Sequence, residues 1–181
     1  MNNLPNILTI IRLATVPVIA YSFYKEKFIL ALALYLFACI TDVVDGFIAR
    51  KYNLITELGK ALDPLADKLV SLTVIICMGL YNMIPLWVSG MFLLKEGIMV
   101  ISGLFLYKKN IVIASNWYGK AATVVTSVSV AIILIFKDTL NDVFKNAIII
   151  IALSMAIFAL IRYTINFFKN YKLNNNINMG N

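Results

Sequence analysis

The sequence predicts an all-α integral membrane protein, a bundle of six transmembrane helices with both termini in the cytoplasm. Of its 181 residues, 61% are hydrophobic and only 14% are charged, and the mean hydropathy is +0.87. A soluble domain is roughly 45–50% apolar and about 25% charged. Because so few charged side chains cannot cover a soluble fold of this size, the composition excludes a water-soluble enzyme and a disordered chain.

Six apolar stretches supply the predicted helices, and each is close to the ~20 residues that cross a bilayer. In order they cover residues 8–24, 28–49, 62–80, 84–106, 119–136 and 146–168. The short connections at 25–27 and 81–83 predict antiparallel neighbours. Two longer connections, 51–61 and 107–117, lie on the opposite side of the membrane, which is the side of the termini.

Basic residues are unevenly divided between the two sides of this layout. Eleven lie on the side of the termini: Arg12, Arg50, Lys51, Lys60, Lys68, Lys108, Lys109, Lys120, Arg162, Lys169 and Lys172. Four lie on the other side: Lys25, Lys27, Lys137 and Lys145. Because cytoplasmic loops carry the excess of lysine and arginine, the count predicts cytoplasmic termini.

The chain is expected to form one membrane domain over residues 1–169, followed by a disordered polar tail over residues 170–181. The tail contains six asparagines and no apolar periodicity. Cys39 and Cys77 lie in apolar runs, and we interpret both as packing residues. Histidine is absent, so carboxylates would have to supply any metal ligand or base.

Four aspartates stand where the membrane makes a charge costly. Asp42 and Asp45 lie near the end of the second stretch, and Asp63 and Asp67 lie at the start of the third. Spacings of three and four residues put each pair on one helical face. A loop joins the two helices, so the faces can meet and bring four carboxylates together. Two divalent cations would neutralise their repulsion, and oxygen ligands favour magnesium, manganese or calcium.

Small residues accompany both pairs of aspartates. Gly46 and Ala49 follow the first pair on its face, and Gly59 precedes the second. The glycines let a ligand approach the backbone closely, and Arg50 indicates that this ligand carries phosphate. A structural alternative remains open, in which the carboxylates cap helices, as Asp63 would ahead of a proline, or pair with nearby basic residues.

Together these residues form a spaced motif. It reads Asp42-Val-Val-Asp45-Gly46-Phe-Ile-Ala49-Arg50, then eight residues, then Gly59-Lys-Ala-Leu-Asp63-Pro-Leu-Ala-Asp67. This resembles the D-x2-D-G-x2-A-R-x8-G-x3-D-x3-D signature of the CDP-alcohol phosphatidyltransferase family, with every fixed position filled. The segment Pro5-Asn6-Ile-Leu8-Thr9-Ile-Ile-Arg12 also resembles the opening of the bacterial phosphatidylglycerophosphate and cardiolipin synthases.

The resemblance implies a role for each part of the motif. Asp42, Asp45, Asp63 and Asp67 would hold two divalent metal ions, Mg²⁺ or Mn²⁺, against the pyrophosphate of a CDP-lipid. Asp67 would also be the catalytic base that deprotonates the acceptor hydroxyl. The cytidine nucleotide would be bound by Gly46, Ala49, Arg50 and Gly59.

The resemblance also implies the setting of the reaction. We expect a metal-dependent homodimer in a bacterial plasma membrane, surrounded by membrane lipids, with the active site facing the cytoplasm. CDP-diacylglycerol and a small alcohol would be its substrates, and no nucleic-acid partner is expected. The net charge of +7 suits anionic lipids at that surface, and is equally explained as a topology signal.

Three basic residues in or beside apolar stretches are candidates for binding a phosphate on the acceptor: Lys95, Lys120 and Arg162. Each also has a structural interpretation. Lys120 and Arg162 would extend to the membrane interface, and Lys95 would pair with Glu96 or another acid. We expect glycerol 3-phosphate as the acceptor, with phosphatidylglycerophosphate and CMP as products.

Two other functions are compatible with parts of the sequence. Phosphatidylglycerol, the acceptor of cardiolipin synthases, also carries a phosphate, and Lys95-Glu96 differs from both the Arg-Glu of phosphatidylglycerophosphate synthases and the Arg-Asp of cardiolipin synthases. A cation carrier would also place carboxylates in membrane helices. A carrier, however, is expected to spread its acids across the membrane depth, whereas these four are gathered at one face.

Overall fold

The computed structural model describes the backbone of residues 4–51, 57–108 and 117–179, and the side chains of residues 8–44, 46, 65–102 and 117–166. Every regular element in these ranges is an α-helix, so the predicted all-α class is confirmed. The six helices are α1 (Leu4–Tyr24), α2 (Phe28–Lys51), α3 (Glu57–Leu80), α4 (Leu86–Lys108), α5 (Trp117–Ile135) and α6 (Asp142–Met179).

Each predicted apolar stretch coincides with one helix, and the differences lie at the helix ends. α3 begins at Glu57, within the connection predicted at 51–61. α6 continues to Met179, so the backbone is helical over most of the segment predicted to be a disordered tail. A helix extends into polar residues at little cost once its packed part has formed. The division of the chain at residue 169 stays a prediction.

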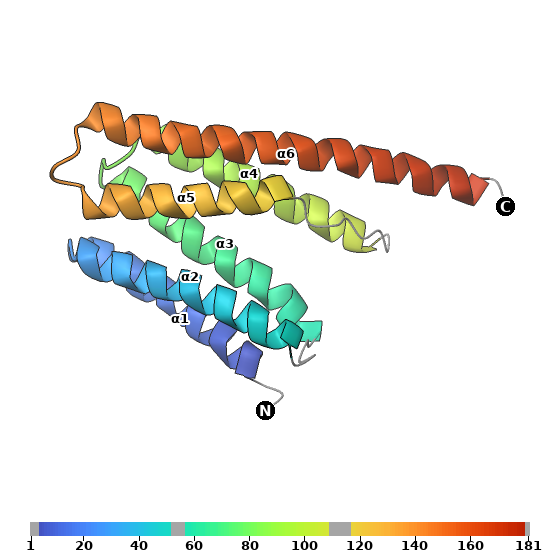
Figure 1. Ribbon diagram of the computed structural model, residues 1–181, viewed down its shortest axis with the longest axis horizontal. Helices are drawn as coiled ribbons and strands as arrows, with labels where there is room; N and C mark the ends of the chain where they lie inside the picture. Colours follow the sequence, from blue (N-terminus) through green and yellow to red (C-terminus); the bar gives the residue numbers. More distant parts are fainter. Residues whose placement is uncertain (1–3, 52–56, 109–116, 180–181) are drawn as a thin grey trace.

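The helices run up and down, and three connections lie at one end, which we call the hairpin end (left in Figure 1). These connections follow α1, α3 and α5. The packing of α1 against α2 and of α3 against α4 confirms the predicted antiparallel neighbours. In the first two connections Glu26 and Asn82 adopt positive φ values of 55° and 57°, the left-handed conformation that ends a helix and turns the chain.

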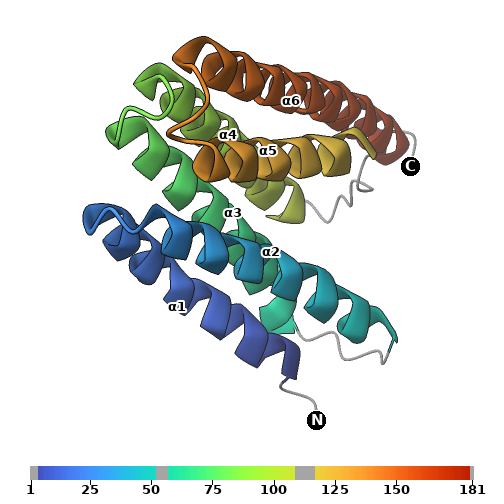
Figure 2. The same ribbon diagram turned by 60° about the vertical axis from the view of Figure 1, so that its left-hand side comes forward.

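The opposite end, which we call the site end, contains the last turns of α2 and the first turns of α3 (Figures 1 and 2). α1 begins and α6 ends toward this same end of the bundle. Both pairs of predicted aspartates are therefore carried to the site end by helices that pack against each other.

A close contact fixes the register of α3 against α4. Ser89 Oγ donates a hydrogen bond of 2.8 Å to the carbonyl oxygen of Ile75. Gly79 permits this approach, because a Cβ atom there would lie 2.4 Å from Ser89 Oγ. Seven residues, or about two helical turns, separate Ile75 from Lys68 and Ser89 from Glu96. The antiparallel register therefore places Lys68 opposite Glu96.

The interior of the bundle is apolar, and so is much of its surface. Buried residues from all six helices form one core that includes Phe23, Tyr35, Val74, Phe92, Ile133 and Ile149. Large apolar side chains also face outward, with exposed fractions of 83% for Ile29, 69% for Ile101 and 70% for Val143. A soluble monomer rarely shows so much apolar surface, whereas lipid covers it in a membrane.

Two helices among the described residues are long and apolar enough to cross a bilayer. They comprise Trp117–Ile135 and Asp142–Asn166, while the apolar parts of α1 and α2, Leu8–Tyr24 and Phe28–Val44, are shorter. These helices and the apolar exterior are consistent with a membrane protein. Six complete spans and their orientation stay predictions.

Candidate active site

Of the four predicted aspartates, Asp42 and Asp67 have described side chains, and they come from two different helices at the site end. The side chain of Asp42 is 40% exposed, and Asp67 is partly buried in the third turn of α3. Their charges are close enough to act on each other. The sequence prediction that α2 and α3 bring acidic groups together is therefore met for these two residues.

Asp45 and Asp63 complete the predicted set, and their backbone is helical in α2 and α3. The helical spacing puts Asp45 one turn after Asp42, and Asp63 one turn before Asp67. The side chains of Asp45 and Asp63 lie outside the described residues. Among the side chains that the structure describes, no three potential metal ligands gather.

The donor chemistry of the site end suits a hard divalent cation. Asp42 and Asp67 both offer carboxylate oxygens, and the backbone of Asp45 and Asp63 lies one helical turn from them. Oxygen donors of this kind are the preferred ligands of Mg²⁺ and Mn²⁺. The residues therefore fit the metals that the sequence predicts.

Arg12 from α1 is a partner of Asp42, although the sequence predicted only its place in the N-terminal segment and in the count of cytoplasmic charges. Its Nη1 lies 2.8 Å from Asp42 Oδ1 and donates a hydrogen bond to it, while the arginine side chain is only 1% exposed. Thr15 Oγ1 donates to the Arg12 carbonyl oxygen at 2.6 Å. A guanidinium buried this deeply needs an anionic partner, and it fixes the orientation of the carboxylate that it contacts.

The predicted nucleotide-binding residues lie in the same two helices. Gly46 follows Asp42 by one turn of α2 and is partly buried. Ala49 and Arg50 belong to the last turn of α2, and Gly59 to the first turn of α3. The surroundings of these last three residues lie outside the described side chains.

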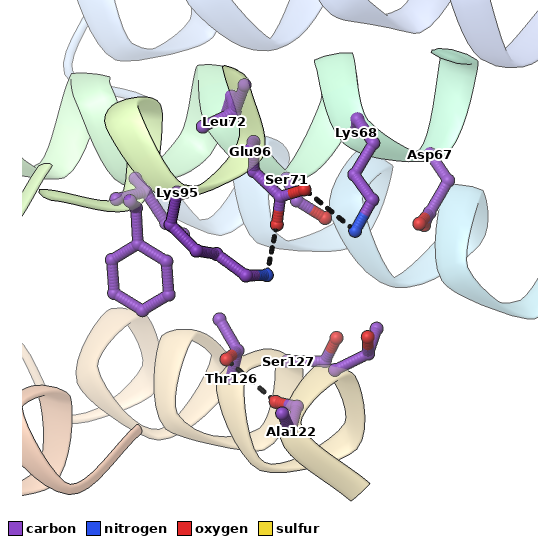
Figure 3. Close-up of a pocket in the computed structure, with 12 residues that line it drawn as sticks. Asp67, Lys68, Ser71, Leu72, Lys95, Glu96, Ala122, Thr126 and Ser127 are labelled. Carbon is purple, nitrogen blue, oxygen red and sulfur yellow. Dashed lines mark hydrogen bonds and ion pairs between the residues drawn. The ribbon is translucent and has the colours of Figure 1, made fainter. Parts of the chain in front are cut away.

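A pocket opens beside Asp67, between α3, α4 and α5 (Figure 3). Its polar lining comes from all three helices: Asp67, Lys68, Ser71, Lys95, Glu96, Thr123, Thr126 and Ser127. Tyr35 Oη of α2 donates to Ser127 Oγ at 3.2 Å, which joins α5 to the helix that carries Asp42. Asp67 therefore lines the pocket and is also one of the predicted metal ligands.

Two lysines in this pocket share one carboxylate. Lys95 Nζ donates a hydrogen bond of 2.6 Å to Glu96 Oε1, and Lys68 Nζ lies 2.9 Å from Glu96 Oε2. Figure 3 shows the two lysine side chains reaching Glu96 from opposite sides. The exposed fractions are 10% for Lys95, 11% for Glu96 and 24% for Lys68. The alternative that pairs Lys95 with Glu96 is confirmed, and this pair still faces the pocket.

The other two candidates for the acceptor phosphate lie elsewhere. Lys120 is exposed in the first turn of α5, and Arg162 is exposed on α6 with its guanidinium 5.2 Å from the centre of the Tyr118 ring. Neither residue lines the pocket beside Asp67. Of the three predicted cations, the structure therefore brings only Lys95 to that pocket, where it meets Lys68.

Arg12 and Lys68 are the site residues that sequence reasoning missed. Both were visible as charged residues within or beside an apolar stretch, which is a costly place for a charge. Their partners lie 30 and 28 positions farther along the chain. The interactions therefore cross between helices.

Known sequences identify the family. The sequence model described as CDP-alcohol phosphatidyltransferase matches residues 2–159. A CDP-diacylglycerol--glycerol-3-phosphate 3-phosphatidyltransferase of Aquifex aeolicus is 33% identical over 172 residues, which cover 92% of this chain and 97% of that protein. A probable phosphatidylglycerophosphate synthase of Mycobacterium tuberculosis is 33% identical over 140 residues, which cover 74% of this chain and 66% of that protein.

A shorter and more similar match comes from Rickettsia bellii, whose protein carries the same name as that of Aquifex aeolicus. It is 54% identical over 77 residues, which cover 41% of this chain and 42% of that protein. The match therefore spans less than half of the Rickettsia relative. The family model, in contrast, covers most of the chain and includes both pairs of aspartates. The chain belongs to the CDP-alcohol phosphatidyltransferase family.

Proposed function

We propose that this member of a transferase family moves a phosphatidyl group from CDP-diacylglycerol to glycerol 3-phosphate and releases CMP. The observation that supports the proposal is the pocket that holds the Asp67 carboxylate together with the ammonium groups of Lys68 and Lys95. A carboxylate can accept a hydroxyl proton, and paired cations can bind a phosphate. The relatives from Aquifex aeolicus and Mycobacterium tuberculosis are named for this activity.

The proposed reaction is a displacement at phosphorus. The hydroxyl oxygen of the acceptor bonds to the phosphorus that carries diacylglycerol, and the bond from this phosphorus to the CMP oxygen breaks. CMP leaves with the electron pair, and Asp67 takes the hydroxyl proton. Asp67 suits this role because it lines the pocket and also belongs to the acidic face of α3.

Asp42, Asp45, Asp63 and Asp67 are the proposed ligands of two Mg²⁺ or Mn²⁺ ions. When bound, these ions would stabilise the negative charge on the phosphorus under attack and on the departing CMP. The contribution of the chain is to hold four carboxylates on two adjacent helices. Arg12 orients one of them, Asp42, through the contact of 2.8 Å.

Substrate binding is proposed on either side of Asp67. Gly46, Ala49, Arg50 and Gly59 would accommodate the nucleotide at the site end. Lys95 and Lys68 would bind the acceptor's phosphate in the pocket, where both line the wall. The roles of Lys120 and Arg162 stay predictions, because both residues lie away from this pocket.

The acceptor is tested by supplying CDP-diacylglycerol with glycerol 3-phosphate or phosphatidylglycerol and identifying the lipid product by mass spectrometry. We expect phosphatidylglycerophosphate with the first acceptor, because paired lysines suit a small phosphate monoester. Release of CMP in the same reaction is the control for phosphatidyl transfer. Cardiolipin as the only product would contradict the proposed acceptor and leave the proposed chemistry at phosphorus intact.

The proposed arrangement in the membrane has six spans with the site end in the cytoplasm. Aromatic and basic side chains at the hairpin end support an interface there, since Lys25 Nζ lies 5.3 Å from the centre of the Tyr24 ring and Lys137 Nζ lies 4.8 Å from that of Phe28. Such rings collect where the bilayer meets water. The bacterial plasma membrane and a homodimer are further proposals, which rest on the family resemblance.

Cysteine labelling in intact cells checks this topology. In a chain whose Cys39 and Cys77 have been replaced, a cysteine at Asn141, in the last connection of the hairpin end, is expected to react with an impermeant reagent. A cysteine at Asn175 is expected to react only after lysis, because positive charge favours the cytoplasmic side. Labelling of the Asn175 position without lysis would contradict the cytoplasmic termini.

A further inference from the structure

Glu96 stands between two lysines that repel each other. Its two carboxylate oxygens contact Lys95 of the same helix at 2.6 Å and Lys68 of the neighbouring helix at 2.9 Å. All three side chains line the pocket beside Asp67 and are mostly shielded from water. Without an anion between them, two ammonium groups in such a place would separate or lose a proton.

We propose that Glu96 is a positioning residue, which holds Lys68 and Lys95 together so that both can bind the acceptor's phosphate. The proposal rests on the proposed function, because it needs a phosphate in this pocket. An ammonium group has three N–H donors. Lys95 directs one donor to Glu96 Oε1, and Lys68 faces Glu96 Oε2 as an ion pair, so donors of both lysines remain for a phosphate. Lys68, with 24% of its side chain exposed, is the more accessible of the two lysines.

The register of α3 and α4 makes this role specific. The contact between Ser89 and Ile75, two turns away, already holds the two helices together. Glu96 is therefore not needed to bring α3 to α4, and its distinct contribution is a negative charge between two positive ones. The effect of removing this charge should depend on whether Lys68 is present.

The test is a double-mutant cycle on the full-length enzyme in lipid nanodiscs. Wild type, Glu96→Gln, Lys68→Met and the double variant are compared for KM toward glycerol 3-phosphate, KM toward CDP-diacylglycerol, and calorimetric binding of glycerol 3-phosphate. Asp138→Asn is the matched control, because it also changes an acid to its amide and removes the partner of a lysine. Asp138 Oδ1 lies 2.8 Å from Lys137 Nζ at the hairpin end, away from the pocket.

We expect Glu96→Gln to raise the KM and the Kd for glycerol 3-phosphate about tenfold, the size of one charged hydrogen bond. The KM for CDP-diacylglycerol should change less than about twofold. In the Lys68→Met background, Glu96→Gln should add no further loss, because no second cation remains to be held. Glu96→Asp, which keeps the charge, should recover part of the binding.

Two results would overturn the inference. Equal losses from Glu96→Gln with and without Lys68 would assign Glu96 a general structural role. Tighter binding of glycerol 3-phosphate by Glu96→Gln would mean that Glu96 competes with the phosphate. Failure of the proposed function would give a different result, because the wild-type enzyme would then use only phosphatidylglycerol as acceptor. The same double-mutant cycle, run with phosphatidylglycerol, would still test the role of Glu96.

Discussion

Asp67→Asn is expected to lower turnover at least about a thousandfold, since the change removes a proposed base and a proposed metal ligand together. Asparagine matches aspartate in shape, so the protein should remain folded. The measurement is CMP release from CDP-diacylglycerol with Mg²⁺ or Mn²⁺ by purified enzyme. The thermal unfolding midpoint of the variant should equal that of wild type, which would show that the loss of turnover is not caused by unfolding.

The same change at Asp42, Asp45 or Asp63 is also expected to abolish turnover, because each would remove one ligand from a shared site. Asp138→Asn at the hairpin end provides the control, as it should keep full activity. Wild-type turnover in any two of the four variants would contradict a single carboxylate site. Retained binding of CDP-diacylglycerol by inactive Asp67→Asn would separate the chemical step from binding.

The helices were predictable because the signal for a membrane helix is strong. A run of about twenty apolar residues between polar connections admits few other structures. The ends of helices carry a weaker signal, and the structure starts α3 at Glu57 and continues α6 to Met179. Polar residues next to a packed apolar segment can either continue its helix or leave it. Composition alone therefore does not predict where α3 begins or where α6 ends.

The spacing of the aspartates was informative because it is a property of single helices. Residues three and four apart share a face, so the sequence indicates which groups lie together on α2 and on α3. The position of each aspartate near the end of an apolar stretch also indicates how deep in the membrane it lies. Spacing does not indicate how each helix is rotated toward its neighbours. Lys120 and Arg162 are therefore candidates for the acceptor's phosphate by sequence, although neither lines the pocket beside Asp67.

Contacts between helices were the part that one sequence could not supply. Lys68 lies next to a predicted metal ligand, yet its partner Glu96 is 28 positions away along the chain, on the next helix, and only 2.9 Å away in space. The close approach of Gly79 to Ser89 sets this pairing. The chemistry of such a cluster therefore depends on packing at a distant position.

Arg12→Gln is expected to lower turnover by about 10- to 100-fold, the usual effect of losing a residue that orients a metal ligand. Arg12 lies in α1, outside the spaced motif, and contacts Asp42 at the site at 2.8 Å. Glutamine keeps a polar side chain and removes the charge. Arg12→Lys should be intermediate, because an ammonium group keeps the charge and lacks the planar fork of the guanidinium.

The measurement is CMP release at saturating CDP-diacylglycerol, together with the Mn²⁺ concentration that gives half of the maximal rate. Lys27→Gln is the matched control, since it removes a basic residue just after α1 at the hairpin end, and its turnover should stay within about twofold of wild type. Because the side chain of Asp42 is 40% exposed, water can solvate its carboxylate after Arg12 is lost. The protein should therefore remain folded, while the Asp42 carboxylate loses its fixed orientation. Wild-type turnover and metal dependence in Arg12→Gln would show that the buried guanidinium serves only the packing of α1.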